Sequence, residues 1–324
     1  MTNKEFEISV IIPLYVIKPQ FFRDLKKFLN QSFKNFEILV VCDQNISLPR
    51  IKGLFLRKII TGQDSTGPAT KRDIALKYVK GKICAFIDDD AYPHPNWLKN
   101  AFNDFNKLNI IAVGGPGVTP PEDGYWEKLA GLVYESIFCS GKAQRRFVPT
   151  HQKYVDDWPA YNLLINTDIL NRVGGYGNDF YGGEDTFLCL KLIKEGKIYY
   201  DPKVVVYHHR RRLFIDLLKQ IFNIGIHRGY FAKKFPETSR QIFYFLPSIL
   251  LIGFFLFLIG SFFNTGISLT FSLVFLFFLI LGAASVFHKT DISSSFLVGL
   301  GIIATHLTYG TGFIKGLLTK NLTR

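Results

Sequence analysis

The stretch Ile83-Cys-Ala-Phe-Ile-Asp-Asp-Asp90 places an apolar run directly before three carboxylates. A short apolar run of this kind is typical of a buried strand. Three adjacent carboxylates repel one another, and partial burial disfavours their charged forms further. A divalent cation relieves both effects, and oxygen ligands suit Mg²⁺ or Mn²⁺, which bridge carboxylates to substrate phosphates. The alternative is a solvated turn that caps the helix after Pro95.

Strand and helix patterns alternate on both sides of this stretch. Apolar runs predict further strands at Ile8–Tyr15, Phe36–Cys42, Lys58–Thr61, Ile110–Val113 and Val204–Tyr207. Amphipathic spacing and helix-start signals predict helices at Phe21–Asn30, Gly67–Val79, Pro95–Phe105, Trp126–Phe138 and Glu184–Glu195. This order favours an α/β domain with a largely parallel sheet.

Acidic residues follow two different strands of this predicted domain. Asp43 comes directly after the strand at Phe36–Cys42, and Asp88–Asp90 come directly after Ile87. Ligands of such sheets bind beyond the carboxyl ends of the strands. We therefore expect these acids to converge on one crevice, although they lie far apart in the sequence.

A glycine-rich loop leads to another acidic pair, Glu184-Asp185, at the predicted start of a helix. Acidic residues are common in a first turn because the helix dipole favours them there. The functional alternative is a general base, which must lie within hydrogen-bond reach of the hydroxyl that it deprotonates. The two residues by themselves leave both interpretations open.

Two basic pairs have similar alternatives. Lys71-Arg72 lie in the first turns of a predicted helix, where they could bind a diphosphate, or they form an exposed basic pair. His208-His209 follow a predicted strand, where an imidazole could bind Mn²⁺, or they are surface histidines near lipid.

The last third of the chain has a composition typical of membrane segments. The 324 residues carry a net charge of +13, yet Ile242 to His288 contains no Asp, Glu, Lys or Arg. Each of three apolar stretches has about 20 residues, enough to cross about 30 Å of hydrocarbon. They are Phe243–Phe263, Ser268–Phe287 and Ser294–Phe313. The third is semi-polar, so we expect two or three spans.

The segment before these stretches is basic and amphipathic. Leu213–Phe235 combines apolar residues with Lys219, Arg228, Lys233 and Lys234. This pattern predicts one or two interfacial helices on anionic lipid, and the alternative is an ordinary solvated helix face. The positive-inside tendency places the basic globular part in the cytoplasm. The four cysteines form no CxxC motif and are expected to be reduced core residues.

Together these residues resemble the inverting nucleotide-sugar glycosyltransferases of glycosyltransferase family 2, of the membrane-anchored bacterial or archaeal type. The resemblance covers roughly residues 8–210. Its motifs, in family order, are Ser9-Val-Ile-Ile-Pro-Leu-Tyr15, Gln31-Ser32, Val41-Cys-Asp43, Gly67-Pro-Ala-Thr-Lys-Arg-Asp73, Phe86-Ile-Asp-Asp-Asp90, Val173-Gly-Gly-Tyr176, Gly183-Glu-Asp185 and Tyr207-His208. It implies an α/β fold of the GT-A type, a mostly parallel sheet flanked by helices, followed by C-terminal transmembrane helices.

The resemblance also implies roles for individual residues. The implied donor-binding residues are Pro13, Tyr15, Asp43, Arg72, Asp88 and Asp89, with Asp43 at the nucleobase and Arg72 on the nucleotide side. The implied ligands of a divalent ion, Mn²⁺ or Mg²⁺, are Asp88, Asp90 and His208. Asp185 matches the catalytic base, with Glu184 beside it. Asp73 departs from the family pattern, because many members have Asn there.

The expected organisation is a catalytic domain at residues 1–207, a membrane-interface segment at 208–241 and a transmembrane region at 242–324. The expected function is transfer of a sugar from a nucleotide-sugar donor to a lipid-linked or cell-surface glycan acceptor at the cytoplasmic membrane. The Gln-x-x-Arg-Trp motif of processive synthases is missing, which favours transfer of a single sugar. The alternatives are transfer to a polyprenyl phosphate and an inactive membrane scaffold. No nucleic-acid recognition motif accompanies the positive charge, and the oligomeric state stays open.

Overall fold

The computed structural model describes residues 5–64, 66–177, 180 and 182–322, and the chain divides into two compact units. The first, called the α/β unit below, consists of the chain up to Val118 together with Val148–His209. The second, called the helical unit, consists of Thr119–Phe147 and the chain from Arg210 onward. The segment Thr119–Phe147 therefore groups with helices that follow it much later in the sequence.

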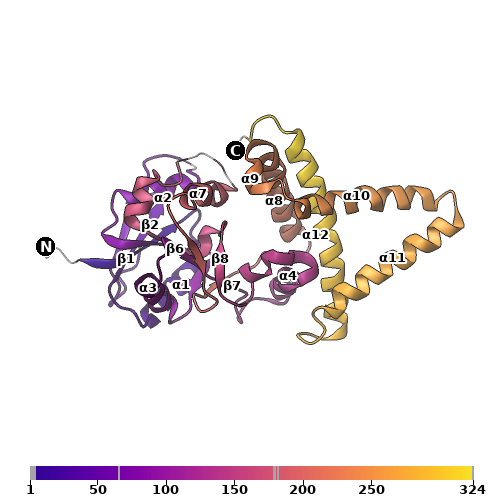
Figure 1. Ribbon diagram of the computed structural model, residues 1–324. Coiled ribbons are helices and arrows are strands. Elements are labelled where there is room, and N and C mark those ends of the chain that lie inside the picture. The colour runs from indigo at the N-terminus through magenta and orange to yellow at the C-terminus, as the bar shows by residue number, and fades with distance from the viewer. Residues whose placement is uncertain (1–4, 65, 178–179, 181, 323–324) are drawn as a thin grey trace. The chain divides into compact units, whose positions relative to one another are not determined.

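The α/β unit is built on two sheets (Figure 1). The strands of the larger sheet are β1 (Phe6–Pro13), β2 (Phe36–Cys42), β3 (Leu56–Ile60), β4 (Gly81–Phe86), β6 (Ala112–Gly114), β8 (Lys153–Val155), β9 (Leu163–Asn166) and β10 (Ile198–Tyr200). Within the described residues their spatial order is β3-β2-β1-β4-β9-β6-β10-β8. A smaller sheet has the order β5 (Ala91–Pro93), β11 (Val206–His208) and β7 (Gly117–Val118).

The strands that carry the predicted acids run in the same direction. β1 pairs in parallel with both β2 and β4, and β2 pairs in parallel with β3. The ends of β1, β2 and β4 therefore lie at one edge of the sheet, as the sequence predicts. β9 is antiparallel to its neighbours β4 and β6, and the sequence patterns gave no sign of this strand.

Helices cover both faces of the larger sheet, because β1 is apolar on both sides. Ile8, Val10 and Ile12 pack with α1 (Pro19–Lys27) and α3 (Trp97–Lys107), and Ile11 packs on the opposite face. The helices on that face are α2 (Pro68–Leu76), α6 (Thr167–Arg172) and α7 (Glu184–Leu192). The 3-10 turns of this unit are η1 (Phe28–Asn30) and η3 (Ala160–Asn162). Cys42, Cys84 and Cys189 are buried in these cores as thiols.

The helical unit contains the apolar stretches. Its elements are α4 (Tyr125–Glu135), α5 (Ile137–Ser140), η2 (Gly141–Arg146), α8 (Ile215–Lys234), α9 (Pro236–Ser239), α10 (Ile242–Ser261), α11 (Thr265–Ala284) and α12 (Ile292–Leu318). Among the described residues, α10, α11 and α12 are long and apolar enough to cross a membrane. α12 is far more buried within the protein than the other two.

Glycines allow α8 and α12 to pack with their backbones in contact. Gly225 and Gly229 on α8 face the backbone of α12 from Tyr309 to Leu317, and Gly312 and Gly316 on α12 face the backbone of α8. A Cβ on Gly229 would collide with the carbonyl oxygen of Phe313. Small residues spaced four apart are the usual means of such close approach between apolar helices.

We predict that Gly229→Ala destabilises the protein by about 1–3 kcal/mol, because the added methyl group has no room beside the α12 backbone. The matched control is Gly253→Ala on α10, where a Cβ would meet no atom within 4 Å. Thermal unfolding of the detergent-purified protein should show a lower midpoint for Gly229→Ala alone. Equal midpoints for the two variants would contradict the close packing.

Candidate functional site

The acidic turn Asp88–Asp90 connects β4 to β5 at the carboxyl edge of the larger sheet. The backbone N–H of Tyr15, just beyond β1, donates a hydrogen bond to Oδ2 of Asp89 at 3.0 Å. Burial raises the pKa of Asp89 to about 6, and the adjacent charges of Asp90 and Asp88 add to this effect. The turn is therefore held beside the end of β1.

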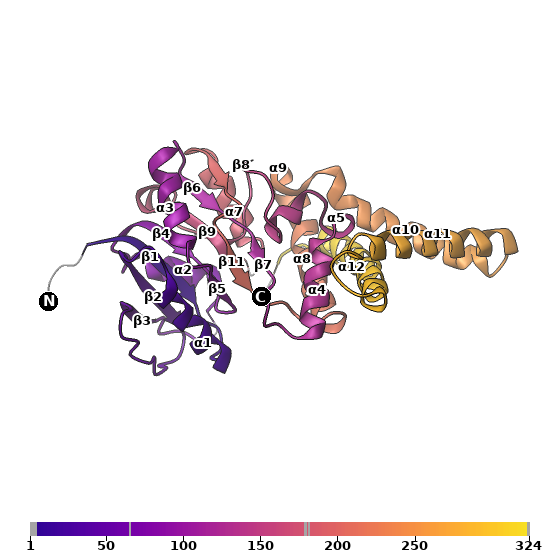
Figure 2. The same ribbon diagram turned by 90° about the horizontal axis from the view of Figure 1, so that it is seen from below.

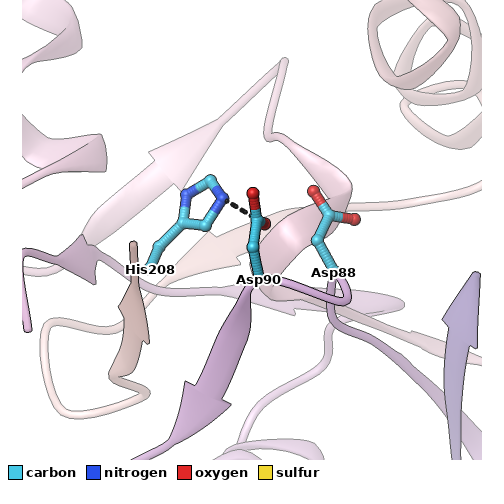
Figure 3. Close-up of side chains that lie close together, drawn as sticks. All are labelled: Asp88, Asp90 and His208. Carbon is cyan, nitrogen blue, oxygen red and sulfur yellow. Dashed lines mark hydrogen bonds and ion pairs between the residues drawn. The ribbon is translucent and has the colours of Figure 1, made fainter. Parts of the chain in front are cut away.

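Asp88, Asp90 and His208 bring three potential metal ligands together (Figure 3). One ligand atom from each lies within 4.8 Å of the others. His208 reaches the cluster because β11 pairs antiparallel with β5, which starts directly after Asp90. Its Nε2 lies 3.0 Å from Oδ1 of Asp90, and the ring of Tyr161 packs against its imidazole. Two carboxylates and one imidazole fit a divalent ion that accepts oxygen and nitrogen ligands, such as Mn²⁺.

The neighbouring histidine ties this cluster to α1. The backbone N–H of His209 donates to the carbonyl oxygen of Asp90 at 3.0 Å. Its Nε2 lies 3.3 Å from Oδ2 of Asp24, a buried residue of α1. The two histidines thus have different surroundings, one at the acidic turn and one against the helix.

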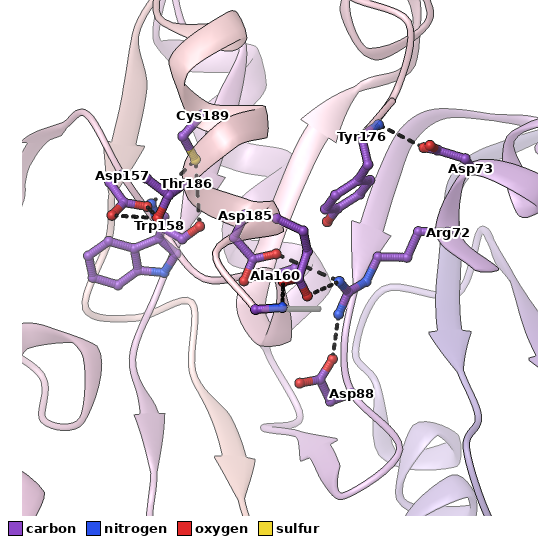
Figure 4. Close-up of polar contacts among 12 residues, drawn as sticks. Arg72, Asp73, Asp88, Asp157, Trp158, Ala160, Tyr176, Asp185, Thr186 and Cys189 are labelled. Carbon is purple, nitrogen blue, oxygen red and sulfur yellow. Dashed lines mark hydrogen bonds and ion pairs between the residues drawn. The ribbon is translucent and has the colours of Figure 1, made fainter. Parts of the chain in front are cut away.

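Arg72 joins the acidic turn to the acids of α7 (Figure 4). Its side chain is only 3% exposed, and Nη2 lies 2.7 Å from Oδ1 of Asp88. Nη1 lies 3.5 Å from Oε1 of Glu184 and 3.6 Å from Oδ1 of Asp185. The guanidinium also lies over the ring of Tyr176, with 5.2 Å to its centroid. One buried cation therefore contacts three carboxylates from two elements.

Asp185 lies in the first turn of α7, directly beside Arg72. The backbone N–H of Ala160 donates to its Oδ2 at 3.0 Å. Burial and the adjacent Glu184 raise the pKa of Asp185 above the usual carboxyl range, although Arg72 opposes this shift. The turn into α7 uses Gly183 at a φ of 77°, a conformation that favours glycine. An acid with a raised pKa suits proton transfer.

Asp73 fixes the glycine loop that precedes α7. Its carboxylate accepts hydrogen bonds from the backbone N–H groups of Tyr176 at 2.7 Å and Gly177 at 2.9 Å. Gly175 has a φ of 61°, and a Cβ there would collide with Oδ1 of Asp73. Asp73, where many family members have Asn, thus stabilises this loop, because its carboxylate accepts both N–H groups.

Asp43 forms a polar cluster at the end of β2. The Nζ of Lys71 lies 2.9 Å from Oδ2 of Asp43 and donates to the carbonyl oxygen of Leu14 at 2.7 Å. Although burial opposes it, hydrogen bonds from Lys71, Thr66 and Thr61 lower the pKa of Asp43. Lys71 is buried, and the sequence alone did not distinguish this position from an exposed one.

The predicted site residues are brought to one edge of the α/β unit with different degrees of exposure. Pro13 is the last residue of β1 and is buried, whereas the side chain of Tyr15 is 68% exposed. Tyr161 and Tyr176 contact the predicted residues and were given no site role, and Lys71 was named only with Arg72 as a possible diphosphate-binding pair. Tyr176 ends the motif Val173-Gly-Gly-Tyr176, to which no role was given, whereas Tyr161 stands in no recognised motif.

Comparisons with known proteins agree with this geometry. The sequence profile of glycosyl transferase family 2 matches residues 9–164. A β-1,3-glucosyltransferase of Escherichia coli, described as acting with UDP-Glc on α-D-GlcNAc-diphosphoundecaprenol, is 30% identical over 200 residues. That match covers 60% of this chain and 72% of the glucosyltransferase.

Two further similarities differ in extent. The pre-mycofactocin glycosyltransferase of Mycobacterium tuberculosis is 25% identical over 180 residues, which is 55% of this chain but only 37% of that protein. A mannosyltransferase of Pyrobaculum calidifontis, solved with GDP-Man and Mn²⁺, has a TM-score of 0.61 at 17% identity. It covers 98% of this chain and 89% of its own, so the likeness concerns the fold.

We predict that Arg72→Met destabilises the protein by about 3–5 kcal/mol, because it leaves buried carboxylates without their cation. At about 2–4 °C per kcal/mol, the midpoint of thermal unfolding should fall by at least about 6 °C. The control is Arg172→Met, whose side chain is 62% exposed and pairs with Glu195 at 3.1 Å. An exposed pair contributes about 1 kcal/mol or less. Similar midpoints of thermal unfolding for both variants would contradict the conclusion that Arg72 stabilises the fold by pairing with buried carboxylates.

Proposed function

This chain belongs to glycosyl transferase family 2, and we propose that it transfers one sugar from a nucleoside-diphosphate sugar to a lipid-linked acceptor, with inversion at C1. The observation that carries the proposal is the contact of Arg72 with Asp88 and Asp185. It joins the candidate metal turn and the candidate base in one polar site, so donor and acceptor chemistry can meet there.

The class of donor and acceptor is supported by the relatives. The Escherichia coli glucosyltransferase is named for a UDP-sugar and a diphosphoundecaprenol-linked sugar, and the mannosyltransferase was solved with GDP-Man. We assign the nucleotide to the edge formed by the ends of β1 and β2. There Asp43, ionised and held by Lys71, would accept hydrogen bonds from the base, and the exposed ring of Tyr15 would pack beside it.

The metal would bind at the acidic turn. Asp88, Asp90 and His208 would hold Mn²⁺ or Mg²⁺, and the bound ion would offset negative charge on the diphosphate leaving group. Asp89 would stay outside this set, because its Oδ2 already accepts the N–H of Tyr15. Arg72 would keep Asp88 and Asp185 in fixed positions while the donor binds.

Asp185 is the proposed general base. Its Oδ2 is oriented by the N–H of Ala160, and its raised pKa matches a group that must accept a proton. The acceptor hydroxyl would lose its proton to Asp185 while its oxygen attacks C1 of the sugar. The bond from C1 to the diphosphate oxygen breaks in the same displacement, which inverts the configuration. Glu184 would support the site through Arg72.

Membrane attachment follows from the helical unit. We propose that α10 and α11 anchor the protein in the cytoplasmic membrane, with the basic α/β unit on the cytoplasmic side. An anchored enzyme would meet an acceptor whose lipid stays in the bilayer. The second candidate is direct transfer to a polyprenyl phosphate, which differs because a phosphate acceptor needs little help from a base.

We predict that Asp185→Asn keeps donor binding but lowers kcat by about 10²–10⁴-fold, the usual contribution of a general base. The control is Glu195→Gln, which removes a carboxylate shortly after α7 and should leave kcat unchanged. Turnover with a lipid-diphosphate sugar acceptor and donor binding by titration calorimetry would be measured. A kcat within about tenfold of the wild type would reject the base role and favour a phosphate acceptor.

We also predict that EDTA abolishes activity and that added Mn²⁺ restores it. His208→Ala should raise the Mn²⁺ concentration for half-maximal activity at least tenfold, since even second-shell losses cost about 10–100-fold in affinity. His151→Ala is the control, because His151 is exposed and lies outside the cluster. An unchanged Mn²⁺ requirement in His208→Ala would remove this residue from the metal site.

A further inference from the structure

The arrangement of α10, α11 and α12 within the helical unit restricts how many of them can cross a bilayer. α12 meets α10 near the start of that helix, where Gly310 packs on Pro247 and Ser248 and accepts a hydrogen bond from the Ser248 hydroxyl at 3.2 Å. It meets α11 near the end of that helix, where Gly299 packs on the backbone of Leu279 and Ala283. The opposite ends of α10 and α11 are joined by residues 262–264.

These contacts form a triangle with α12 as its base. Gly299 and Gly310 lie eleven residues apart, or about 16 Å along a helix. From these points α10 and α11 run for about 20–27 Å to their common loop. Figures 1 and 2 show α12 running across the other ends of the pair. Three helices in this arrangement cannot all cross the same bilayer.

We propose that α10 and α11 cross the bilayer as a hairpin while α12 lies along the membrane surface at the base of that hairpin. This inference depends on the membrane attachment proposed above and specifies its form. The partner surface is the boundary between lipid headgroups and acyl chains, where amphipathic helices bury one apolar side.

α12 has the apolar stripe that such a position needs. Ile292, Phe296, Leu300 and Leu318 are exposed and lie on one side of the helix. The opposite side is occupied by protein, because Gly301 contacts Leu213 and Val133 there, and Gly312 and Gly316 contact α8. Gly299 and Gly310, which contact α11 and α10, lie at the edge of the apolar stripe. The semi-polar composition that set this stretch apart thus reflects close packing at the glycines, and the apolar stripe lies on the side of α12 that meets the α10–α11 hairpin.

The charges of α8 give an independent argument. Leu213, just before α8, contacts Gly301, and α8 then runs beside α12 to Lys233, whose Nζ donates to the carbonyl oxygens of Leu317 and Thr319. If α12 crossed the bilayer, α8 would enter the hydrocarbon with it. Exposed charged side chains such as Asp216 and Lys219 would then lie in lipid, where charges are strongly disfavoured. At the membrane surface, Lys219 would instead lie among anionic headgroups and Asp216 would stay in water.

Labelling of single cysteines in the full-length protein tests this topology. In a Cys139→Ala background, Lys82→Cys, Asn264→Cys and Lys320→Cys would be exposed to an impermeant maleimide in sealed vesicles. We expect Lys82→Cys and Lys320→Cys to react from one side and Asn264→Cys from the other. If Lys320→Cys and Asn264→Cys were both labelled from the side opposite to that of Lys82→Cys, the surface position of α12 would be overturned. All three reacting from one side would overturn the membrane-spanning hairpin itself.

Depth measurement supplies a second test that does not depend on sidedness. A fluorophore at Phe296→Cys, Leu300→Cys or Leu318→Cys should be quenched best by lipids brominated near the headgroup. Leu273→Cys in α11 is the control, and deep bromines should quench it best. All four positions are exposed, so the substitutions leave the packing intact. A gradient of depth along α12 would contradict the proposal.

Discussion

The site depends on one buried cation among acids that repel one another. Asp88 comes from the end of β4, while Glu184 and Asp185 come from the start of α7. Without a cation these groups would protonate or move apart, because desolvation penalises each unpaired charge. Arg72 contacts all three, with its closest oxygen at 2.7 Å. A planar guanidinium with several donors can serve carboxylates from different elements at once, which an ammonium cannot do as well.

Three consecutive residues of α2, Lys71 to Asp73, hold different parts of the carboxyl edge of the sheet in place. Successive helical side chains point about 100° apart, so neighbours reach different parts of the fold. Lys71 reaches Asp43 and the end of β1, Arg72 reaches the acids, and Asp73 holds the glycine loop before α7. One short helix thus connects the proposed nucleotide end of the site to the proposed base. A shift of α2 would disturb all of these contacts together.

The sequence predicted the parts of this arrangement that have local signals. β1, β2 and β4 are apolar runs, and those of β2 and β4 lead into acids, so both the strands and the edge where they meet were predictable. β9 and β10 have four and three residues, too few to show a period, and were missed. The contacts of Arg72 and Lys71 depend on tertiary packing, and a basic pair in a helix has the same local pattern when exposed. The roles of individual residues came from the order of motifs, which reflects the fold as a whole.

In the helical unit, amino-acid composition does not show whether a helix crosses the membrane. α12 is less apolar than α10 or α11, and composition alone leaves a marginal membrane span. Much of the difference comes from glycines, each placed where another helix or side chain approaches closely. Glycine lowers the mean hydropathy of a helix without adding a polar side chain. The mean hydropathy of α12 therefore reflects its close packing as much as its affinity for lipid. A helix that contacts α4, α5, α8, α10 and α11 and keeps one apolar stripe is adapted to lie at a boundary, because that stripe is left for lipid.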